Sequence, residues 1–261
     1  MSYIKGLLYA LSLYTRIPVP AGKLKAEDGR KAIVFLPVAG AIIGLIIFGL
    51  SFLFSGKSLP ELFVISVYTL VPLVLTGGFH VDGFMDVADA KNSYKSPEEK
   101  LKILKDPHIG AFAIIRLVML GFVWLTAMSV LVRAEERTAF YLCSISFFMV
   151  RAACALLSVC VKRARKDGML ISETDGVSAS DKLIISLQLV AGIVVMIALY
   201  PLAGVLSVIA VILFSVYYVL MCMREFSGVT GDTAGYYITV CETLILTAIA
   251  ASELICHHCN F

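Results

Sequence analysis

The sequence predicts an all-α integral membrane protein, a polytopic helical bundle in which residues 1–261 form a single domain. Only 16% of the residues are charged and 59% are hydrophobic, whereas about a quarter of the residues of a soluble domain are charged. The apolar residues also fall in runs long enough to cross a hydrocarbon core of about 30 Å. These observations exclude a soluble globular protein and a disordered chain. The net charge of +3 is too small for a nucleic-acid-binding surface.

A helix lying in the membrane interface is expected at the N-terminus, before the first span. Residues 3–20 are apolar but interrupted by Lys5 and Arg16, and Ile4, Leu7 and Leu8 follow helical spacing. A cleaved signal peptide is the alternative, but no small-residue cleavage site is obvious. We therefore expect residues 1–31 to form a cytoplasmic or interfacial segment.

About seven apolar runs follow, each of the about 17 to 25 residues that a spanning helix needs. They are approximately Ala32–Phe54, Leu62–Phe79, Ala111–Val132, Ala139–Val161, Leu183–Tyr200, Leu202–Met223 and Tyr236–Ile255. The fifth and sixth meet at Tyr200-Pro201, which is either a tight hairpin or a re-entrant pair. The expected number of spans is therefore about seven, within a range of six to eight.

The orientation follows from the Lys and Arg residues, which are retained in cytoplasmic loops. Most of the 22 lie in segments 1–31, 80–110, 162–182 and 223–235, whereas the opposite loops hold only Lys57, Arg133 and Arg137. We expect the N-terminus and the three long polar segments to be cytoplasmic, with 80–110 as the catalytic loop.

The seven cysteines are expected to be structural, because most lie in or beside apolar runs, where a thiol behaves as a small apolar group. The tail Cys256-His257-His258-Cys259 carries metal-ligand residue types. Zinc sites normally draw on two separated pairs, so we interpret the tail as incidental.

The strongest chemical signal is His80-Val81-Asp82-Gly83-Phe84-Met85-Asp86-Val87-Ala88-Asp89. On a helix, Asp82, Asp86 and Asp89 share one face within about 60°. Their mutual repulsion needs a cation, and Mg²⁺ is usually held by one or two carboxylates plus substrate phosphates. A solvated acidic segment is the alternative. His80 is a candidate ligand, general base or structural residue.

Two further clusters lie on the same predicted side of the membrane. Lys105-Asp106-Pro107-His108 has the residue types for phosphate or ribose contact, while Asp106 with Pro107 also fits a helix N-cap. Gly228-Val229-Thr230-Gly231-Asp232-Thr233-Ala234-Gly235 suits either a phosphate-binding loop or an ordinary turn.

Two arginines fall inside predicted spans, where a cation is costly and usually faces a cavity or an acid. Arg116 is placed either to extend to the membrane surface or to reach the acidic cluster. Arg151 lies deeper and is a candidate partner of Glu242. A purely structural ion pair is the alternative.

Taken in order, these motifs resemble the cobalamin (5'-phosphate) synthases, also called adenosylcobinamide-GDP ribazoletransferases. The resemblance extends from about Leu13 to Glu242. It is carried by Leu13-Tyr14-Thr15-Arg16-Ile17-Pro18-Val19-Pro20, the acidic segment 80–89, Lys105-Asp106-Pro107-His108-Ile109-Gly110-Ala111-Phe112, Ala164-Arg165-Lys166-Asp167-Gly168 and Gly228-Val229-Thr230-Gly231-Asp232-Thr233.

The resemblance implies a Mg²⁺-dependent enzyme of the cytoplasmic (inner) membrane of a prokaryote. Such an enzyme joins adenosylcobinamide-GDP to α-ribazole or its 5'-phosphate by phosphoryl transfer and releases GMP. It implies Asp82, Asp86 and Asp89 as metal ligands, with catalytic roles for Asp82, His80, Lys105 and Asp106. The expected substrate-binding residues are Arg16, His108, Arg116, Arg151, Arg165, Asp167, Thr230, Asp232 and Glu242. The resemblance leaves open whether the enzyme forms a homo-oligomer.

Two other functions are compatible with parts of the pattern. A membrane phosphotransferase of the CDP-alcohol type would use a similar Asp-rich, Mg²⁺-dependent site. A transporter would account for the intramembrane arginines, although transporters keep their polar groups near the midplane, whereas here they gather at one surface.

Overall fold

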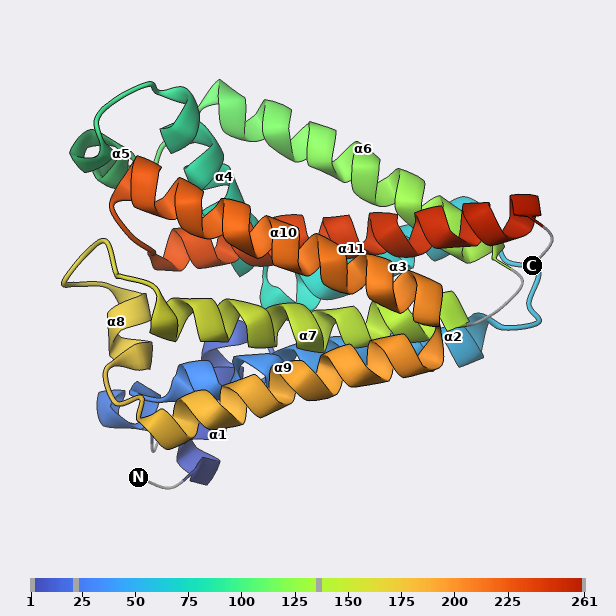
Figure 1. Ribbon diagram of the computed structural model, residues 1–261, viewed down its shortest axis with the longest axis horizontal. Helices are drawn as coiled ribbons and strands as arrows, with labels where there is room; N and C mark the ends of the chain where they lie inside the picture. Colours follow the sequence, from blue (N-terminus) through green and yellow to red (C-terminus); the bar gives the residue numbers. More distant parts are fainter. Residues whose placement is uncertain (1–2, 21–23, 135–137, 260–261) are drawn as a thin grey trace.

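The computed structural model describes residues 3–20, 24–134 and 138–259, with only the backbone for residues 26 and 257–259. These ranges contain no β-strand, and the long helices lie side by side in a bundle (Figure 1). The α-helices are α1 Tyr3–Tyr14, α2 Leu36–Phe54, α3 Glu61–Thr76, α4 Phe79–Asn92, α5 Pro97–Ile103, α6 Ala111–Arg133, α7 Thr138–Cys160, α8 Met169–Thr174, α9 Ala179–Leu199, α10 Pro201–Phe226 and α11 Gly231–Cys259. The all-α prediction is confirmed, as is the N-terminal helix.

Within the described residues, 6 helical segments are long and apolar enough to span a membrane, or up to 7 if α3 and α4 together form one broken span. The 6 are Ala32–Phe54, Ala111–Arg133, Thr138–Cys160, Ala179–Leu199, Pro201–Phe226 and Gly231–Cys256. The expected range is therefore confirmed. The junction at Tyr200 is a tight hairpin, since α9 and α10 have 21 and 26 residues.

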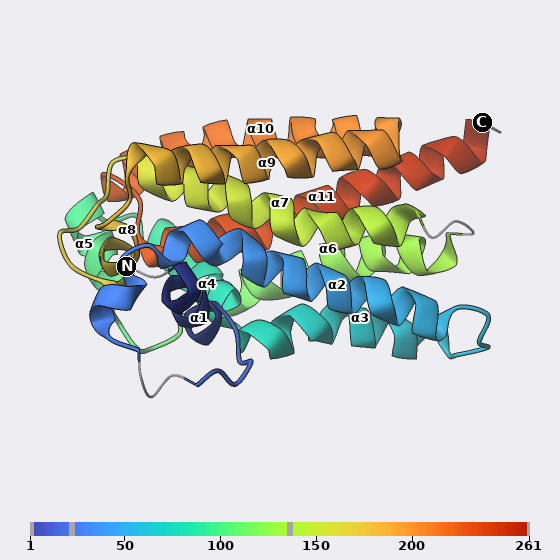
Figure 2. The same ribbon diagram turned by 90° about the horizontal axis from the view of Figure 1, so that it is seen from below.

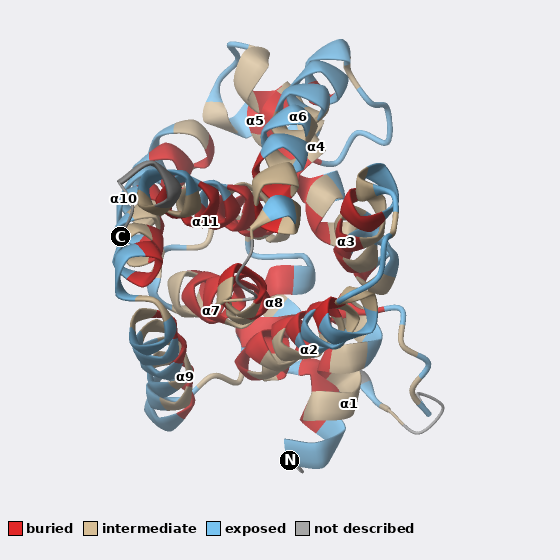
Figure 3. Cartoon of the chain, turned by 90° about the vertical axis from the view of Figure 1, so that its right-hand side faces the viewer, coloured by how far each residue is buried: buried red, intermediate tan, exposed pale blue. Residues whose placement is uncertain are grey.

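Helix α7 forms the centre of the bundle and packs against α2, α9 and α11 (Figure 3). In its spanning segment 72% of the residues are buried, against 17% in those of α6 and α9. The outer helices instead expose large apolar side chains, such as Phe122 at 68% and Leu213 at 66%. A surface of this kind fits a hydrocarbon solvent rather than water.

The polar segments contain more helix than the predicted loops. Segment 80–110 contains α4 and α5, and segment 162–182 contains α8 and the start of α9. The predicted loop 223–235 is wrong in extent, because α10 continues to Phe226 and α11 begins at Gly231. Ser96 caps the start of α5 and Ser178 caps the start of α9 through their hydroxyl groups. These two helices therefore begin at caps within the polar segments and not where an apolar run begins.

All of these polar segments lie at one end of the bundle, together with the N-terminal helix (Figures 1 and 2). The C-terminus and the α2–α3 connection lie at the other end. The motif clusters that the sequence assigns to one side of the membrane therefore lie at the same end of the bundle.

Candidate active site

Two glycines turn the chain from α3 into α4. Gly77 and Gly78 have φ of 64° and 77°, in the left-handed region that favours glycine. The axes of α3 and α4 consequently differ by 89°. Arg16 packs against this turn. A Cβ atom added to Gly77 would lie 2.2 Å from Arg16 Nε, and the backbone N–H of Arg16 donates to Leu75 O at 2.7 Å. The turn thus connects the first predicted motif to the acidic helix.

A carboxylate cluster forms where α4 meets α11, and we define it as Asp82, Asp86 and Asp232. The two helices approach closely because each carries a glycine at the contact. A Cβ atom added to Gly83 would lie 2.7 Å from Asp232 O, and a Cβ atom added to Gly235 would lie 2.9 Å from His80 O. Asp82, Asp232 and Asp89 all lie near enough for their charges to act on the Asp86 carboxyl group. The structure thereby joins two motifs that are about 150 residues apart in the sequence.

Asp89, although it shares the helical face of Asp82 and Asp86, has a different set of contacts. Its Oδ2 accepts the backbone N–H of Gly110, and its Oδ1 accepts that of Ala113 at 2.8 Å. Both oxygens therefore satisfy the first turn of α6. In this geometry Asp89 supports the cluster by tying α4 to α6.

Asp106 does not cap α6, so the N-cap interpretation of this residue is wrong. The N-cap is Gly110, and the cap is supplied by Asp89. Asp106 instead accepts the backbone N–H of His108 at 3.0 Å and contacts its ring Nδ1 at 2.7 Å. These hydrogen bonds lower the pKa of the Asp106 carboxyl. Both side chains are exposed and touch no member of the carboxylate cluster among the described residues.

The carboxylate cluster fits Mg²⁺ as a site completed by substrate. No three His, Cys, Asp or Glu side chains within the described part of the chain are arranged to hold a metal by themselves. Mg²⁺ needs only one or two carboxylates when phosphates and water supply its other ligands. Asp82 is exposed and Asp86 is half-buried, and among the described residues neither accepts a hydrogen bond. The residues present therefore suit a metal bound together with a phosphate group.

Cationic and hydroxyl groups lie beside this cluster. Arg165, Asp167, Thr230 and Asp232, all predicted to bind substrate, line one small pocket of about 80 Å³. The Arg165 guanidinium lies 3.9 Å from the Asp232 carboxylate. Lys105 forms an ion pair of 3.1 Å with Asp167 and thereby lowers the pKa of that carboxyl. Residues from three separate motifs therefore form one charged surface.

Thr230 also has a local structural role at the start of α11. Its Oγ1 accepts the N–H of Thr233 at 3.1 Å, and its own N–H donates to Thr233 Oγ1 at 2.9 Å. This reciprocal cap fixes the first turn of α11, on which Asp232 lies. The cap and phosphate-loop interpretations of this motif are compatible.

His80, Arg151 and Glu242 line a different cavity, of about 250 Å³, among α3, α4, α6, α7 and α11. Arg151 and Glu242 form the predicted ion pair, and Arg151 also donates to Phe147 O at 3.1 Å. His80 is buried and lies about 160° from Asp82 around α4, as expected from a step of two residues on a helix. These residues therefore lie on the other side of α4 from the carboxylate cluster.

Arg116 is not brought to the carboxylates either. It is exposed on α6, lines a groove with Lys91, Tyr217 and Tyr236, and forms no ion pair within the described residues. The sequence predicts that Arg116 either extends to the membrane surface or reaches the acidic cluster. The structure does not form the contact with the acidic cluster.

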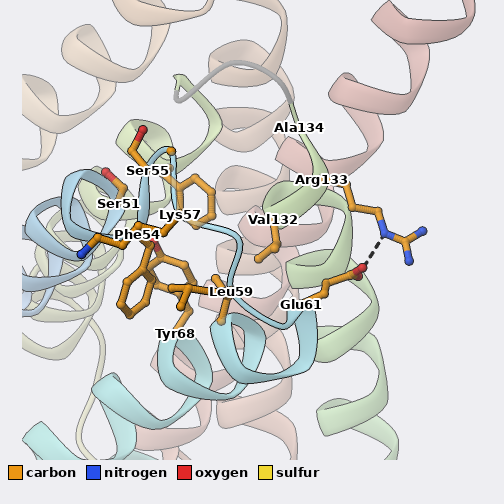
Figure 4. A pocket seen from close by; sticks show the side chains of 13 residues that line it. Ser51, Phe54, Ser55, Lys57, Leu59, Glu61, Tyr68, Val132, Arg133 and Ala134 are labelled. Carbon is orange, nitrogen blue, oxygen red and sulfur yellow. Dashed lines mark hydrogen bonds and ion pairs between the residues drawn. The ribbon is translucent and has the colours of Figure 1, made fainter.

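A cavity of about 400 Å³ at the opposite end of the bundle is separate from this site (Figure 4). It is lined by aromatic residues such as Phe54, Tyr68 and Phe140, and its rim carries an ion pair of 3.0 Å between Arg133 and Glu61. None of its lining residues belongs to the predicted motifs.

Sequence reasoning missed the contact between Gly83 of α4 and Gly235 of α11, although each glycine lies one to three residues from a motif aspartate.

Fold and site define the class: a polytopic helical membrane protein with a carboxylate-rich site at one end of the bundle. The chain matches the cobalamin-5-phosphate synthase family over residues 6–250. A protein of Lachnoclostridium phytofermentans named adenosylcobinamide-GDP ribazoletransferase is 32% identical over 97% of this chain and 96% of its own length. A protein of that name from Clostridium botulinum (strain Alaska E43) is 28% identical over 91% of this chain and 94% of its own length. Another from Brevibacillus brevis is 28% identical over 95% of this chain and 99% of its own length.

The chain therefore belongs to the cobalamin-5-phosphate synthase family, and the resemblance stated from its motifs is confirmed. It is an enzyme, a transferase of late cobalamin biosynthesis. No solved structure matches the chain.

Proposed function

We propose that the enzyme joins adenosylcobinamide-GDP to α-ribazole or α-ribazole 5'-phosphate in a Mg²⁺-dependent reaction that releases GMP. The names of its relatives support these substrates. The observation that carries the proposal is the convergence of Asp82 and Asp86 with Asp232, beside Arg165 and the Lys105–Asp167 pair. Such a site can bind a diphosphate through a shared cation and through basic side chains.

In the proposed reaction a ribazole hydroxyl oxygen forms a bond to the phosphorus attached to cobinamide, while the bond from that phosphorus to the GMP oxygen breaks. Asp82 and Asp86 hold Mg²⁺, which when bound neutralises the charge of the diphosphate. A carboxylate of the cluster accepts the hydroxyl proton, since His80 faces the cavity on the other side of α4. Arg165 and Lys105 stabilise the departing GMP. Positioning and electrostatics account for most catalysis of phosphoryl transfer.

We further propose that the site faces the cytoplasm from the cytoplasmic membrane of a prokaryote. The basic segments support this orientation, because Lys and Arg are retained on the cytoplasmic side. Both substrates carry phosphate or sugar groups that a cytoplasm-facing opening would admit directly from water.

The test is GMP release by purified protein given adenosylcobinamide-GDP and α-ribazole over a series of Mg²⁺ concentrations. Asp82→Asn and Asp86→Asn should each lower the rate at least about 100-fold, as expected for loss of a charge that stabilises the transition state. Asp175→Asn is the matched control, because Asp175 is an exposed carboxylate directly after α8, a helix at the same end of the bundle, and it should retain the full rate.

Near-full activity of both cluster variants, with unchanged Mg²⁺ dependence, would show that the metal assignment is wrong. Turnover of a CDP-alcohol in place of the corrinoid substrate would overturn the proposed reaction.

A further inference from the structure

A groove of about 490 Å³ lies among α4, α6, α10 and α11 near the end that carries the carboxylate cluster. One part of its lining is polar and basic, formed by Lys91, Arg116, Tyr217 and Tyr236. The rest is apolar and includes Met119 and Val123 of α6. The groove is therefore amphipathic.

Neither cation of the groove forms an ion pair with an acidic side chain within the described residues. Lys91 Nζ donates to the Tyr217 hydroxyl at 2.7 Å and lies 5.3 Å and 5.5 Å from the ring centres of Tyr217 and Tyr236. Arg116 is exposed on α6, about one and a half turns from its start. Positive charge beside a bilayer is costly when no ion pair offsets it, so this pair of cations is suited to an anion.

The apolar part of the groove faces the surroundings of the bundle. Met119 and Val123 are 54% and 46% exposed, and they follow Arg116 at spacings of three and seven residues, on the same side of α6. An anionic group bound at Arg116 would thus continue into an apolar wall. This combination matches a phospholipid, with its phosphate at the cations and an acyl chain along α6.

The groove is separate from the carboxylate cluster. On α4, the groove residues Phe84, Ala88 and Lys91 lie about 160° around the helix axis from the face of Asp82 and Asp86. A molecule in the groove therefore does not meet the phosphate groups that the cluster would bind.

We propose that this groove binds one anionic phospholipid, with Lys91 and Arg116 holding the headgroup phosphate. Tyr217 and Tyr236 then border the headgroup at the level where tyrosines are common in membrane proteins. The proposal does not depend on the substrates of the enzyme, and the activity assay does not test it.

Native mass spectrometry of the detergent-purified enzyme with added phosphatidylglycerol or phosphatidylcholine tests the proposal. One phosphatidylglycerol should be retained at a roughly tenfold lower lipid concentration than phosphatidylcholine, because the two cations each favour an anionic headgroup. Arg116→Gln and Lys91→Gln should each weaken phosphatidylglycerol binding about fivefold, while Arg116→Lys should retain most of it.

Lys102→Gln is the matched control, since it removes one exposed positive charge at the same end but outside the groove. Equal binding of both lipids, or an equal loss in the Arg116→Gln and Lys102→Gln variants, would overturn the proposal. Displacement of the lipid by GDP would also overturn it, because the groove would then be a nucleotide subsite. Thermal unfolding in the same detergent confirms that each variant is folded.

Discussion

At the scale of single residues, two of the ion pairs, Arg151–Glu242 and Arg133–Glu61, differ in how strongly they should stabilise the bundle. The side chains of Arg151 and Glu242 are 1% and 9% exposed, whereas those of Arg133 and Glu61 are 73% and 40% exposed. Removing one partner of a buried pair leaves an uncompensated charge and costs about 3–5 kcal/mol, while an exposed pair contributes about 0–1 kcal/mol.

We therefore predict that Glu242→Gln lowers the melting temperature in detergent by many degrees and that Glu61→Gln changes it little. A thiol-reactive dye is a suitable probe, because Cys143, Cys154, Cys222 and Cys241 are buried and become accessible only on unfolding. Equal shifts in the two variants would contradict the assignment of Arg151 and Glu242 as a stabilising pair.

Glu173 should make stability depend on pH. Burial raises the pKa of its carboxyl from 4.5 to about 7, and the hydrogen bond from the Tyr14 hydroxyl offsets only part of this. The folded protein thus holds this proton more tightly than the unfolded chain. The stability that results is fully present below pH 4.5 and is lost as the pH rises through about 7.

Glu173→Gln keeps the acceptor for Tyr14 without the charge, so it should raise the melting temperature at pH 8 and leave it unchanged at pH 4.5. Glu98→Gln, at an exposed carboxylate, should change neither value. A melting-temperature gain for Glu173→Gln that is the same at both pH values would rule out titration of this group.

The acidic face of α4 could be predicted from spacing alone, but the separate contacts of its members could not. Asp82 and Asp86 face the site, whereas Asp89 caps α6 from 21 residues away in the chain. Asp106 with Pro107 has the local pattern of an N-cap, yet the long-range contact with Asp89 satisfies the helix instead. Capping by a distant side chain leaves no local pattern, so the sequence could not distinguish the two aspartates.

At the scale of elements, the site depends on how closely α4 approaches α11. A methyl group on Gly83 would lie 2.7 Å from the Asp232 backbone oxygen, so Gly83→Ala must push the two helices apart. The substitution would thus move Asp232 away from Asp86. Displacement of a catalytic group by about 1 Å can lower the rate about 100-fold.

We expect Gly83→Ala to reduce GMP release by at least about tenfold while the protein stays folded. Gly121→Ala is its control, since a methyl group on Gly121 of α6 meets no atom within 4 Å. If both alanine variants retained full activity, the close contact between α4 and α11 would have no part in catalysis.

Helix positions were predictable from the apolar runs, whereas the direction of α4 was not. Outside the acidic face, apolar residues extend around most of α4 instead of forming one narrow stripe, so its own pattern does not specify a single partner helix. The turn is determined by the two left-handed glycines, Gly77 and Gly78. A Gly-Gly pair marks a turn, but the angle of that turn depends on what packs against it, here Arg16.

At the scale of the whole molecule, the apolar surface and the charges are separated along the bundle. The outer faces of α6, α9 and α10 expose apolar side chains, while the motif clusters lie at the end that holds α1, α5 and α8 (Figure 1). This separation means that a bulky polar substrate can approach the carboxylate cluster from water while the rest of the bundle stays in the bilayer. It also makes the orientation of the enzyme measurable.

Lys102 and Lys57 are exposed and lie at opposite ends of the bundle, Lys102 on α5 and Lys57 between α2 and α3 (Figure 1). We predict that an impermeant maleimide added to intact cells labels Lys57→Cys and spares Lys102→Cys, each made in a chain with Cys160, Cys256 and Cys259 replaced by Ser. After lysis both should react, which shows that each introduced thiol is accessible. The buried cysteines do not interfere, because burial keeps them from the reagent. The reverse labelling pattern in intact cells would place the carboxylate cluster outside and exclude a cytoplasm-facing site.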